Sequence, residues 1–517
     1  MNPDYAIVGA GSAGATLAAW LSERGASVVL LESGPDYRSA DAPADMRSPN
    51  PANIIVAPEY GQFRYDDLMA RRTKAQKPRV YWRGRGVDGS SAINGQIAIR
   101  AMVEDLESWV EDGATGWDFV SVLPYFNRLK TDLRFADKPY HGHNGPIPVY
   151  RAPVTLWGPV DQALGEASLS AGLPWAEDHN APHALGVSPY AINSRDSVRV
   201  STNDGYLGPA RGRNNLQIVG NALVDRVLFE GARAVGVRYL RGDDVHELHA
   251  GTVILSAGAV HSPAILMRSG IGLAKDLHSL GIPVRADLPV GQSFQDHPGA
   301  SFVVLLKEEF APSPGFRHTN CCVRCSSGLA GAGAGDMMFV AMNRLGDSIG
   351  RHVAGGAPVF GLITVWVNQC VSRGELTLQS VDPRVDPFIE ENMLADPSDQ
   401  LRLRDGIHRV REMFATQAFT CIGNVRPGGA DWSALNTDAA ADRWALENVG
   451  DTQHGTSSCR MGHPDAETTV VDPECRVLGF ESLYVIDASI MPSVIRANTH
   501  LTTVMIAECM ADQLLPS

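Results

Sequence analysis

The sequence has no apolar run long enough to cross a membrane, few cysteines and no excess of positive charge. Its 517 residues include only 8 cysteines, too few for the disulfide framework of a small secreted protein. The net charge of −14 argues against nucleic acid or an anionic membrane as the main partner. These absences exclude a membrane-spanning protein and a disulfide-stapled module, and they leave a globular protein with reduced thiols.

One cysteine pair has the spacing of a metal or redox motif, Cys322-Val-Arg-Cys325. The sequence has no second CxxC motif, and no helix is predicted to begin at this one. We therefore predict no metal site.

The clearest pattern is a strand–helix–strand unit at the start of the chain. An apolar strand at Tyr5–Val8 leads into the turn Gly9-Ala-Gly-Ser-Ala-Gly14, and a helix then connects to a second apolar strand that ends at Glu32. Glycines in such a turn let the backbone approach a pyrophosphate, and a terminal carboxylate can accept both ribose hydroxyls. The unit predicts dinucleotide binding. It starts almost at Met1, which leaves no room for a signal peptide and predicts a cytoplasmic protein.

The chain is too long for one compact core, so we expect two domains. The predicted nucleotide-binding domain is discontinuous and comprises residues 1–150, 199–299 and 449–517. The predicted second domain comprises residues 151–198 and 300–448. Within it, strands are expected at Met337–Met342, Val359–Val367 and Glu375–Gln379, and a helix at Gln400–Phe414. The tract 326–335 is rich in Gly, Ala and Ser, which indicates either a mobile active-site loop or a long hairpin connection.

Five segments, in order along the chain, resemble the glucose–methanol–choline (GMC) oxidoreductases, a family of FAD-dependent alcohol oxidases and dehydrogenases. The first is the strand–helix–strand unit. The other four are Gly84-Arg-Gly-Val-Asp-Gly-Ser-Ser-Ala-Ile-Asn94, Gly258-Ala-Val-His-Ser-Pro-Ala-Ile-Leu-Met-Arg-Ser-Gly-Ile-Gly272, His454-Gly-Thr-Ser-Ser-Cys-Arg-Met-Gly462, and Asp487-Ala-Ser-Ile-Met-Pro492 followed by Arg496-Ala-Asn-Thr-His500. The resemblance therefore spans the chain from its first strand to its last helix.

The resemblance implies an α/β fold, with a Rossmann-like FAD-binding domain and a discontinuous substrate-binding domain built on an antiparallel sheet. It also implies FAD as the cofactor. Positions that match the family's motifs or adjoin them are expected to bind it: Gly9, Gly11, Ser12, Ala13, Gly14, Glu32, Ser33, Arg85, Gly89, Ser90, Asn94, Gly95, Gln96, Ile97, Val224, Ala257, Gly258, Asp487, Ala488, Thr499 and His500.

Two positions in the second segment bear on how FAD is held. Some family members bond the flavin to a histidine just before the asparagine of this segment; here the residue is Ile93, which predicts non-covalent FAD. Asp88 stands where the family usually has a glycine. Aspartate tolerates a positive φ better than most residues, but its charge is unfavourable near a pyrophosphate unless the side chain points away.

Alcohol oxidation needs a base for the hydroxyl proton and an acceptor for the hydride. A flavin accepts the hydride, and histidine is the usual base near neutral pH. By the resemblance, His454 matches the family's catalytic histidine and Asn498 the partner position, so we predict that His454 is the base and that Asn498 binds the substrate oxygen. The alternatives are a structural His454 and a catalytic His500. No role is assigned to His261, His297 and His318.

Trp366 matches a position where hydroxymethylfurfural and aryl-alcohol oxidase-like members place a tryptophan on the substrate side. An aromatic wall suits an apolar or aromatic alcohol. The alternative is a tryptophan in the core of a sheet.

The function implied is oxidation of a primary or secondary alcohol to the carbonyl, with electrons passed to O₂. Two alternatives stay open: a dehydrogenase of the same fold that uses a quinone or another acceptor, and a lyase such as the hydroxynitrile lyases, in which FAD is structural. A non-catalytic FAD-binding protein is disfavoured because both polar active-site positions are filled.

Overall fold

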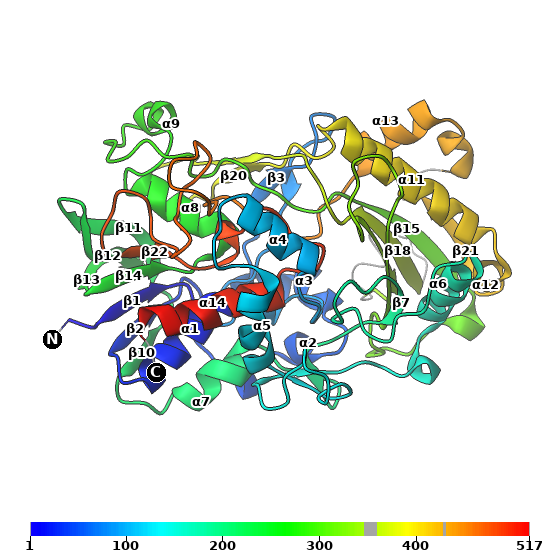
Figure 1. Cartoon of the computed structure of the whole chain (residues 1–517), viewed down its shortest axis with the longest axis horizontal. Coiled ribbons are helices and arrows are strands. Elements are labelled where there is room, and N and C mark those ends of the chain that lie inside the picture. The colour runs from blue at the N-terminus through cyan, green and yellow to red at the C-terminus, as the bar shows by residue number, and fades with distance from the viewer. Residues whose placement is uncertain (1, 346–358, 428–430, 516–517) are drawn as a thin grey trace.

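The computed structural model describes residues 2–345, 359–427 and 431–515. The molecule is elongated, with a parallel sheet toward one end of its long axis and an antiparallel sheet toward the other (Figure 1). Both chain termini lie at the end that holds the parallel sheet.

The parallel sheet has five strands in the order β10-β2-β1-β14-β22, and every neighbouring pair is parallel. Their bounds are β10 Leu216–Val219, β2 Val28–Leu31, β1 Tyr5–Val8, β14 Thr252–Leu255 and β22 Leu483–Val485. Helix α1 (Ser12–Glu23) packs on β1 and β2, and strand β12 (Arg233–Arg241) packs on β14. This sheet confirms the Rossmann-like part of the expected fold.

The turn after β1 requires glycine at two positions. Gly9 has a φ of +97°, and a Cβ atom on Gly14 would lie 1.9 Å from the carbonyl oxygen of Gly9. Helix α1 therefore packs against the end of β1 as closely as two backbones allow. The strand–helix–strand unit forms with nearly the bounds that the sequence predicts.

The antiparallel sheet has six strands in the order β21-β15-β18-β17-β16-β7. Their bounds are β21 Gly423–Pro427, β15 Gly299–Leu306, β18 Phe360–Val367, β17 Met337–Met342, β16 Cys321–Cys325 and β7 Gly186–Pro189. Helices α6 (Pro159–Ser170), α11 (Pro397–Phe414) and α12 (Gln417–Thr420) pack on it, and α13 (Asp438–Asn448) packs on α11. The tract 326–335 connects β16 to β17, so it is a hairpin connection.

Side chains of the six-stranded sheet alternate between two environments. On β18, Ile363, Val365 and Val367 belong to the hydrophobic core of the helical layer. Their neighbours Leu362, Thr364 and Trp366 instead line a cavity. The same alternation holds on the adjacent strands, where Phe302, Phe339 and Ala341 are in the core and Ser301, Val340 and Met342 line the cavity. This period of two is the normal geometry of a strand.

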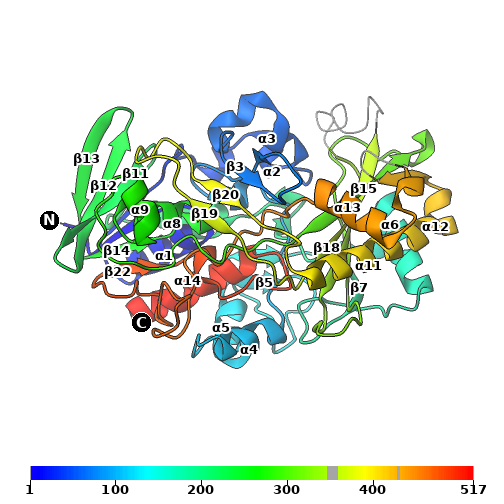
Figure 2. The same cartoon turned by 90° about the horizontal axis from the view of Figure 1, so that it is seen from above.

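A third sheet joins segments far apart in the chain. Strands β19 (Glu375–Thr377) and β20 (Phe388–Glu390) form a four-stranded sheet with β3 (Met69–Arg71) and β4 (Arg79–Val80). Figure 2 shows β3 and β20 between the two ends of the molecule. Residues 375–390 are predicted to belong to the second domain, yet strands β19 and β20 form one sheet with strands of the first. The division into domains therefore stays a prediction.

The described residues form further helices and strands, and of these α14 packs on α1 and α5. The helices are α2 Ala44–Arg47, α3 Ala52–Val56, α4 Val103–Glu111, α5 Phe119–Arg128, α7 Gly208–Ala210, α8 Gly258–Arg268, α9 Ala274–Ser279 and α14 His500–Leu514. The strands are β5 Lys130–Asp132, β6 Ile147–Val149, β8 Ser194–Arg195, β9 Val198–Arg199, β11 Leu223–Glu230 and β13 Asp244–His249.

In the described ranges, no helix combines the length and the apolar character that a membrane span needs. All the cysteines lie in those ranges and are free thiols there. Cys322 lies on β16, with its sulfur 3.1 Å from Nδ1 of His179. The His179 Nε2 donates to the carbonyl oxygen of Gly186 at 2.9 Å, so its Nδ1 accepts from the thiol. Burial raises the pKa of Cys322, so this cysteine is a protonated core residue.

Candidate active site

A cavity of about 500 Å³ is lined by residues from both large sheets. Predicted cofactor-binding residues from five separate stretches of the chain take part in its lining: Gly9, Gly11, Ser12, Ala13, Glu32, Ser33, Gly89, Ser90, Asn94, Gly95, Ile97, Val224, Ala257, Gly258, Asp487, Ala488, Thr499 and His500. His454, Asn498 and Trp366 line the same cavity. Both ends of the chain thus contribute to one site.

Three predicted cofactor-binding residues are absent from the cavity lining that the described residues form. Gly14 packs on the turn that precedes its helix. The Gln96 side chain donates from Nε2 to the carbonyl oxygen of Ser48 at 2.6 Å. Arg85 donates to the carbonyl oxygen of Ser33 at 3.3 Å. For these three, direct contact with the cofactor stays a prediction.

Glu32, at the end of β2, is buried and accepts hydrogen bonds on both carboxylate oxygens. These oxygens lie 2.9 Å from the Ala10 nitrogen, 2.9 Å from the Gly34 nitrogen and 3.0 Å from the Gly86 nitrogen. The Ser33 hydroxyl also donates to Glu32, at 3.1 Å. Ala10 belongs to the first glycine-rich turn and Gly86 to the second, so one carboxylate ties the two turns together.

The cavity fits a dinucleotide such as FAD. A Cβ atom on Gly89 would lie 3.0 Å from the Cα of Gly11, so the two turns meet without side chains and present their backbones to a ligand. Within the described ranges, the buried Nε2 of His500 has no hydrogen-bond partner, while its Nδ1 lies 3.0 Å from the Ser12 hydroxyl. A buried polar atom normally has a partner, and a ligand in the cavity would supply one.

Asp88 adopts the left-handed conformation that its position requires, with φ at +85°. Its carboxylate accepts from the Thr202 hydroxyl at 2.7 Å, from the Asn203 nitrogen at 3.2 Å and from the Ser91 hydroxyl. Burial raises the pKa of the Asp88 carboxyl, and these hydrogen bonds oppose that rise. The side chain points into the protein, which is the condition under which its charge is compatible with a pyrophosphate.

Ile93 lines the cavity at the position where a covalent flavin link needs a histidine. Its hydrocarbon side chain has no nucleophilic atom, so it cannot form the link.

Acid precipitation of the purified protein is expected to release the predicted FAD, because Ile93 cannot hold it covalently. The yellow colour and the absorption spectrum of free FAD should appear in the supernatant. A covalent flavoprotein treated in parallel is the control, since its colour stays in the pellet. Colour that stays with the precipitated protein would contradict the expectation.

His454 follows helix α13, and Asn498 lies just before α14. His454 is only 8% exposed, and its Nε2 lies 3.0 Å from the amide nitrogen of Asn498. The Tyr190 hydroxyl donates to the amide oxygen of Asn498 at 3.1 Å. Because the amide oxygen faces Tyr190, the amide NH₂ faces His454, and Nε2 of His454 is the acceptor in this pair.

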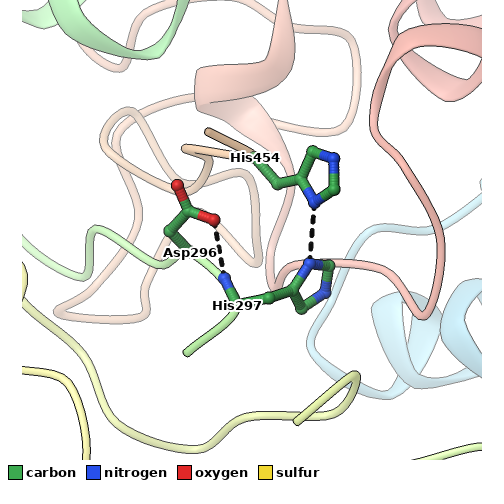
Figure 3. Close-up of side chains that lie close together, drawn as sticks. All are labelled: Asp296, His297 and His454. Atoms are coloured by element: carbon green, nitrogen blue, oxygen red, sulfur yellow. Dashed lines mark hydrogen bonds between the residues drawn. The ribbon is translucent and has the colours of Figure 1, made fainter. Parts of the chain in front are cut away.

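A second set of groups surrounds the other ring nitrogen of His454. Its Nδ1 lies 2.9 Å from Nδ1 of His297 and 2.7 Å from the Thr452 hydroxyl. Figure 3 shows the two rings facing each other through these nitrogens, with Asp296 beside them. His297 Nε2 lies 2.9 Å from the carbonyl oxygen of Ile495, and Thr452 donates to the Asp296 carboxylate at 2.9 Å.

Burial keeps both histidine rings uncharged, because an imidazolium would lose its water there. The pKa of His454 lies well below its usual value, and the neighbouring His297 and Arg83 lower it further. Burial lowers the pKa of His297 to about 4. Both rings are therefore neutral near pH 7, so His454 is in the form that can accept a proton.

Asp296, His297 and His454 are also the one group in the described ranges whose potential metal-ligating atoms lie within 4.8 Å of one another. Each of these potential ligand atoms already has a hydrogen-bond partner in the protein. The Asp296 carboxylate accepts from the His297 backbone nitrogen at 2.7 Å and from the Tyr81 hydroxyl at 2.6 Å. The geometry is that of a hydrogen-bonded network, and the absence of a metal stays a prediction.

Trp366 forms a wall beside the histidines. Its indole nitrogen donates to Asn368 at 3.0 Å, which fixes the ring. The ring centroid lies 6.4 Å from that of His297, nearly parallel, and 6.4 Å from that of His454, nearly edge-on. Trp366 is also buried in the hydrophobic core. Trp366 is therefore both a residue of the sheet core and part of the cavity wall, so its position agrees with both predicted alternatives.

Tyr190, Thr452 and the place of His297 in the site are not predicted from the sequence. Tyr190 belongs to none of the recognised motifs. Thr452 lies two residues before His454, outside the motif that begins there, and His297 follows Asp296 without a recognisable spacing to any other site residue. Only the folded chain brings them together.

Models of the GMC oxidoreductase family match residues 3–299 and 371–507. The chain is 36% identical to the 5-(hydroxymethyl)furfural oxidase of Methylovorus sp. (strain MP688), a match that covers 99% of this chain and 98% of that protein. It is 36% identical to an oxygen-dependent choline dehydrogenase of Pseudomonas syringae pv. syringae (strain B728a), covering 99% of this chain and 93% of that one. The crystal structure of pyridoxine 4-oxidase from Mesorbium loti is similar with a TM-score of 0.88 at 27% identity, covering 99% of both chains.

These matches extend over both large sheets and over the segments that line the cavity. The GMC oxidoreductases carry FAD, and the cavity fits that cofactor. The chain therefore belongs to the GMC oxidoreductase family, and it is an FAD-dependent enzyme that acts on alcohol groups.

Proposed function

We propose that the enzyme oxidises a primary or secondary alcohol to the carbonyl, with His454 as the base. The observation that carries this proposal is the contact between Nε2 of His454 and the amide of Asn498 inside the cavity, at 3.0 Å. One group is an acceptor and the other a donor, so an alcohol hydroxyl that lies beside the pair and contacts both can donate to Nε2 and accept from the amide.

The protein groups then have distinct roles. As the hydroxyl O–H bond breaks, the proton moves to Nε2 of His454. The Asn498 amide donates to the substrate oxygen and stabilises its developing negative charge, and Tyr190 keeps the amide in that orientation. Bound FAD supplies the two-electron acceptor for the hydride of the alcohol carbon.

The residues that would hold FAD are those of the glycine-rich turns and of the start of α14. Glu32 lines the end of the cavity formed by these turns, and we propose that it also binds the adenosine ribose. His500 lines the cavity with its unpartnered Nε2 among the described residues, which favours contact with the cofactor over a role as the base.

We propose an aromatic or furan-like alcohol as the substrate. Trp366 lies beside His454, and the six-stranded sheet adds aliphatic or thioether side chains to the cavity lining, including Val340, Met342 and Leu362. Such a surface favours a flat, apolar molecule. The similarity to a protein named 5-(hydroxymethyl)furfural oxidase supports the same class. The second named relative is a choline dehydrogenase, so choline belongs among the test compounds.

We propose O₂ as the electron acceptor. Two similar proteins carry names that point to oxygen, an oxidase and an oxygen-dependent dehydrogenase. A cytoplasmic location and the lack of a nucleic-acid partner are kept as proposals, supported by the free thiols and by the net charge of −14.

The enzyme is expected to lose its yellow colour when a benzylic or furanic alcohol is added without oxygen, because the alcohol reduces the bound FAD. Readmission of O₂ should restore the colour and yield hydrogen peroxide. The measurement is the flavin absorption spectrum, followed for benzylic, furanic, aliphatic and sugar alcohols and for choline. Buffer without alcohol is the control.

Three results would change the assignment. A flavin that bleaches with alcohol but recolours only with a quinone identifies the dehydrogenase. A flavin that stays oxidised with every alcohol, together with release of cyanide from a cyanohydrin, identifies the lyase. Bleaching by choline alone would contradict the proposed substrate class.

A further inference from the structure

We propose that His297 is a positioning residue that, together with Thr452, holds the neutral His454 ring in the tautomer with its proton on Nδ1. The inference rests on the proposed role of His454 as the base and adds how the ring is prepared for it. A neutral imidazole carries one proton, and only the nitrogen without it can accept another. The partners of Nδ1 therefore decide whether Nε2 can act.

The carbonyl oxygen of Ile495 sets the protonation of His297. A carbonyl oxygen only accepts, so His297 Nε2, at 2.9 Å from it, must carry the proton. The His297 ring is fully buried, and with its pKa lowered to about 4 it stays neutral. Its Nδ1 is then a lone pair, and this lone pair faces Nδ1 of His454 at 2.9 Å (Figure 3).

Thr452 also requires a proton on Nδ1 of His454, independently of His297. Its hydroxyl proton is donated to Asp296 at 2.9 Å, and that carboxylate also accepts from the backbone nitrogen of His297 at 2.7 Å and from the hydroxyl of Tyr81 at 2.6 Å. The Thr452 oxygen therefore presents a lone pair to Nδ1 of His454, at 2.7 Å. Two acceptors from different segments face one nitrogen, which must be the N–H of the ring.

The other tautomer of His454 is unfavourable at both nitrogens. Nδ1 would then place a lone pair against the lone pairs of His297 and Thr452. Nε2–H would point at the amide NH₂ of Asn498, whose orientation Tyr190 fixes. A ring in that state could not accept the substrate proton at Nε2. Free histidine favours the Nε2–H form, so the surrounding groups reverse the intrinsic preference of the ring.

The proposed tautomer of His454 is incompatible with a metal ion between the two Nδ1 atoms. A metal would need a lone pair on Nδ1 of His454, which leaves the proton on Nε2, opposite the Asn498 donor. The hydrogen bonds on the cavity side thus favour the proton over a metal at Nδ1.

Nuclear magnetic resonance of the FAD-loaded enzyme with ¹⁵N-labelled histidine tests the tautomer directly. A proton–nitrogen correlation spectrum distinguishes a protonated from an unprotonated ring nitrogen, and loss of one set of signals in His454→Gln assigns that ring. We expect protonated Nδ1 and unprotonated Nε2 for His454, and the opposite pattern for His297. Protonated Nε2 on His454 in the wild-type enzyme would overturn the proposal.

Three variants test the consequence for the reaction. His297→Leu combined with Thr452→Val removes both acceptors, and it should give His454 a protonated Nε2 and slow anaerobic flavin reduction by about 10²–10³. His297→Asn keeps an oxygen near the place of Nδ1 and should stay within about 3-fold of wild type. Thr456→Val is the matched control, because it removes a buried hydroxyl whose contacts are the carbonyl oxygen of Gln295 at 3.4 Å and the Ser457 hydroxyl at 3.2 Å, and neither contact involves the His454 ring.

The outcomes separate this inference from the proposed function. If the double variant keeps both the Nδ1–H pattern and the wild-type rate with unchanged FAD content, the positioning role is wrong. If the double variant does not fold, the wild-type spectrum still decides. A His454→Gln variant with the wild-type rate would instead remove the proposed base, whatever the tautomer.

Discussion

Replacement of His454 by glutamine is expected to slow anaerobic flavin reduction by about 10²–10⁴, or roughly 3–5 kcal/mol of barrier. Glutamine retains a polar side chain next to Asn498, but it cannot take the hydroxyl proton near neutral pH. Stopped-flow absorbance of the flavin measures this half-reaction separately from reoxidation by O₂. FAD content should not change, because the turns that would hold FAD are formed by other segments.

Asn498→Ala is the matched comparison. It removes a hydrogen bond and leaves the proton acceptor, so we expect a smaller loss, about 10-fold. Burial holds the pKa of His454 well below its usual value, so the wild-type rate should be flat above about pH 6.5 and fall only as acid protonates the ring. A wild-type reduction rate in His454→Gln would show that another group is the base, and His500 would be the next residue to replace.

Glu32→Ala is expected to deprive the enzyme of most of its FAD and to lower its stability. The substitution removes the acceptor for the backbone nitrogens of Ala10, Gly34 and Gly86. Each buried donor left unpaired costs about 1–3 kcal/mol, and the proposed bonds to the ribose are lost as well. The ratio of flavin to protein absorbance after gel filtration at micromolar concentration measures FAD retention, and thermal unfolding measures Tm.

Two further variants make this prediction specific. Glu247→Ala on β13 is a control, because this glutamate is exposed on the small β11-β12-β13 sheet and should change neither quantity. Glu32→Gln keeps the size of the side chain but turns one acceptor into a donor that faces backbone N–H groups, so it should also lose FAD. Full retention of FAD by Glu32→Ala would show that the two glycine-rich turns hold together without this carboxylate.

The sequence predicted best where the signal is local. Strand β1 begins and ends where the short apolar run and the glycines that follow it place it, and β17 has the predicted bounds. The predicted base and its partner line one cavity. Each could be predicted because it belongs to a short motif that matches the family. These features depend on neighbouring residues in the chain.

What the sequence could not predict depends on contacts between distant segments. Strand β20 pairs with β3, more than 300 positions earlier in the chain, and such pairing leaves no trace in the periodicity of either strand. The contact between the rings of His297 and His454 is equally non-local. The hydrogen bond from Gln96 to the carbonyl oxygen of Ser48 likewise joins segments that are far apart in the chain.

The alternation of side chains along the six-stranded sheet has a consequence for how this enzyme can change over time. Ser301, Met342 and Leu362 face the cavity, so their replacement alters what the cavity accepts. The residues between them, such as Phe302, pack among the helices, where truncation costs about 3–5 kcal/mol. The residues that determine the substrate range and those that stabilise the fold thus lie on opposite faces of the same strands. Substitutions on the cavity face can therefore change the substrate range at little cost in stability.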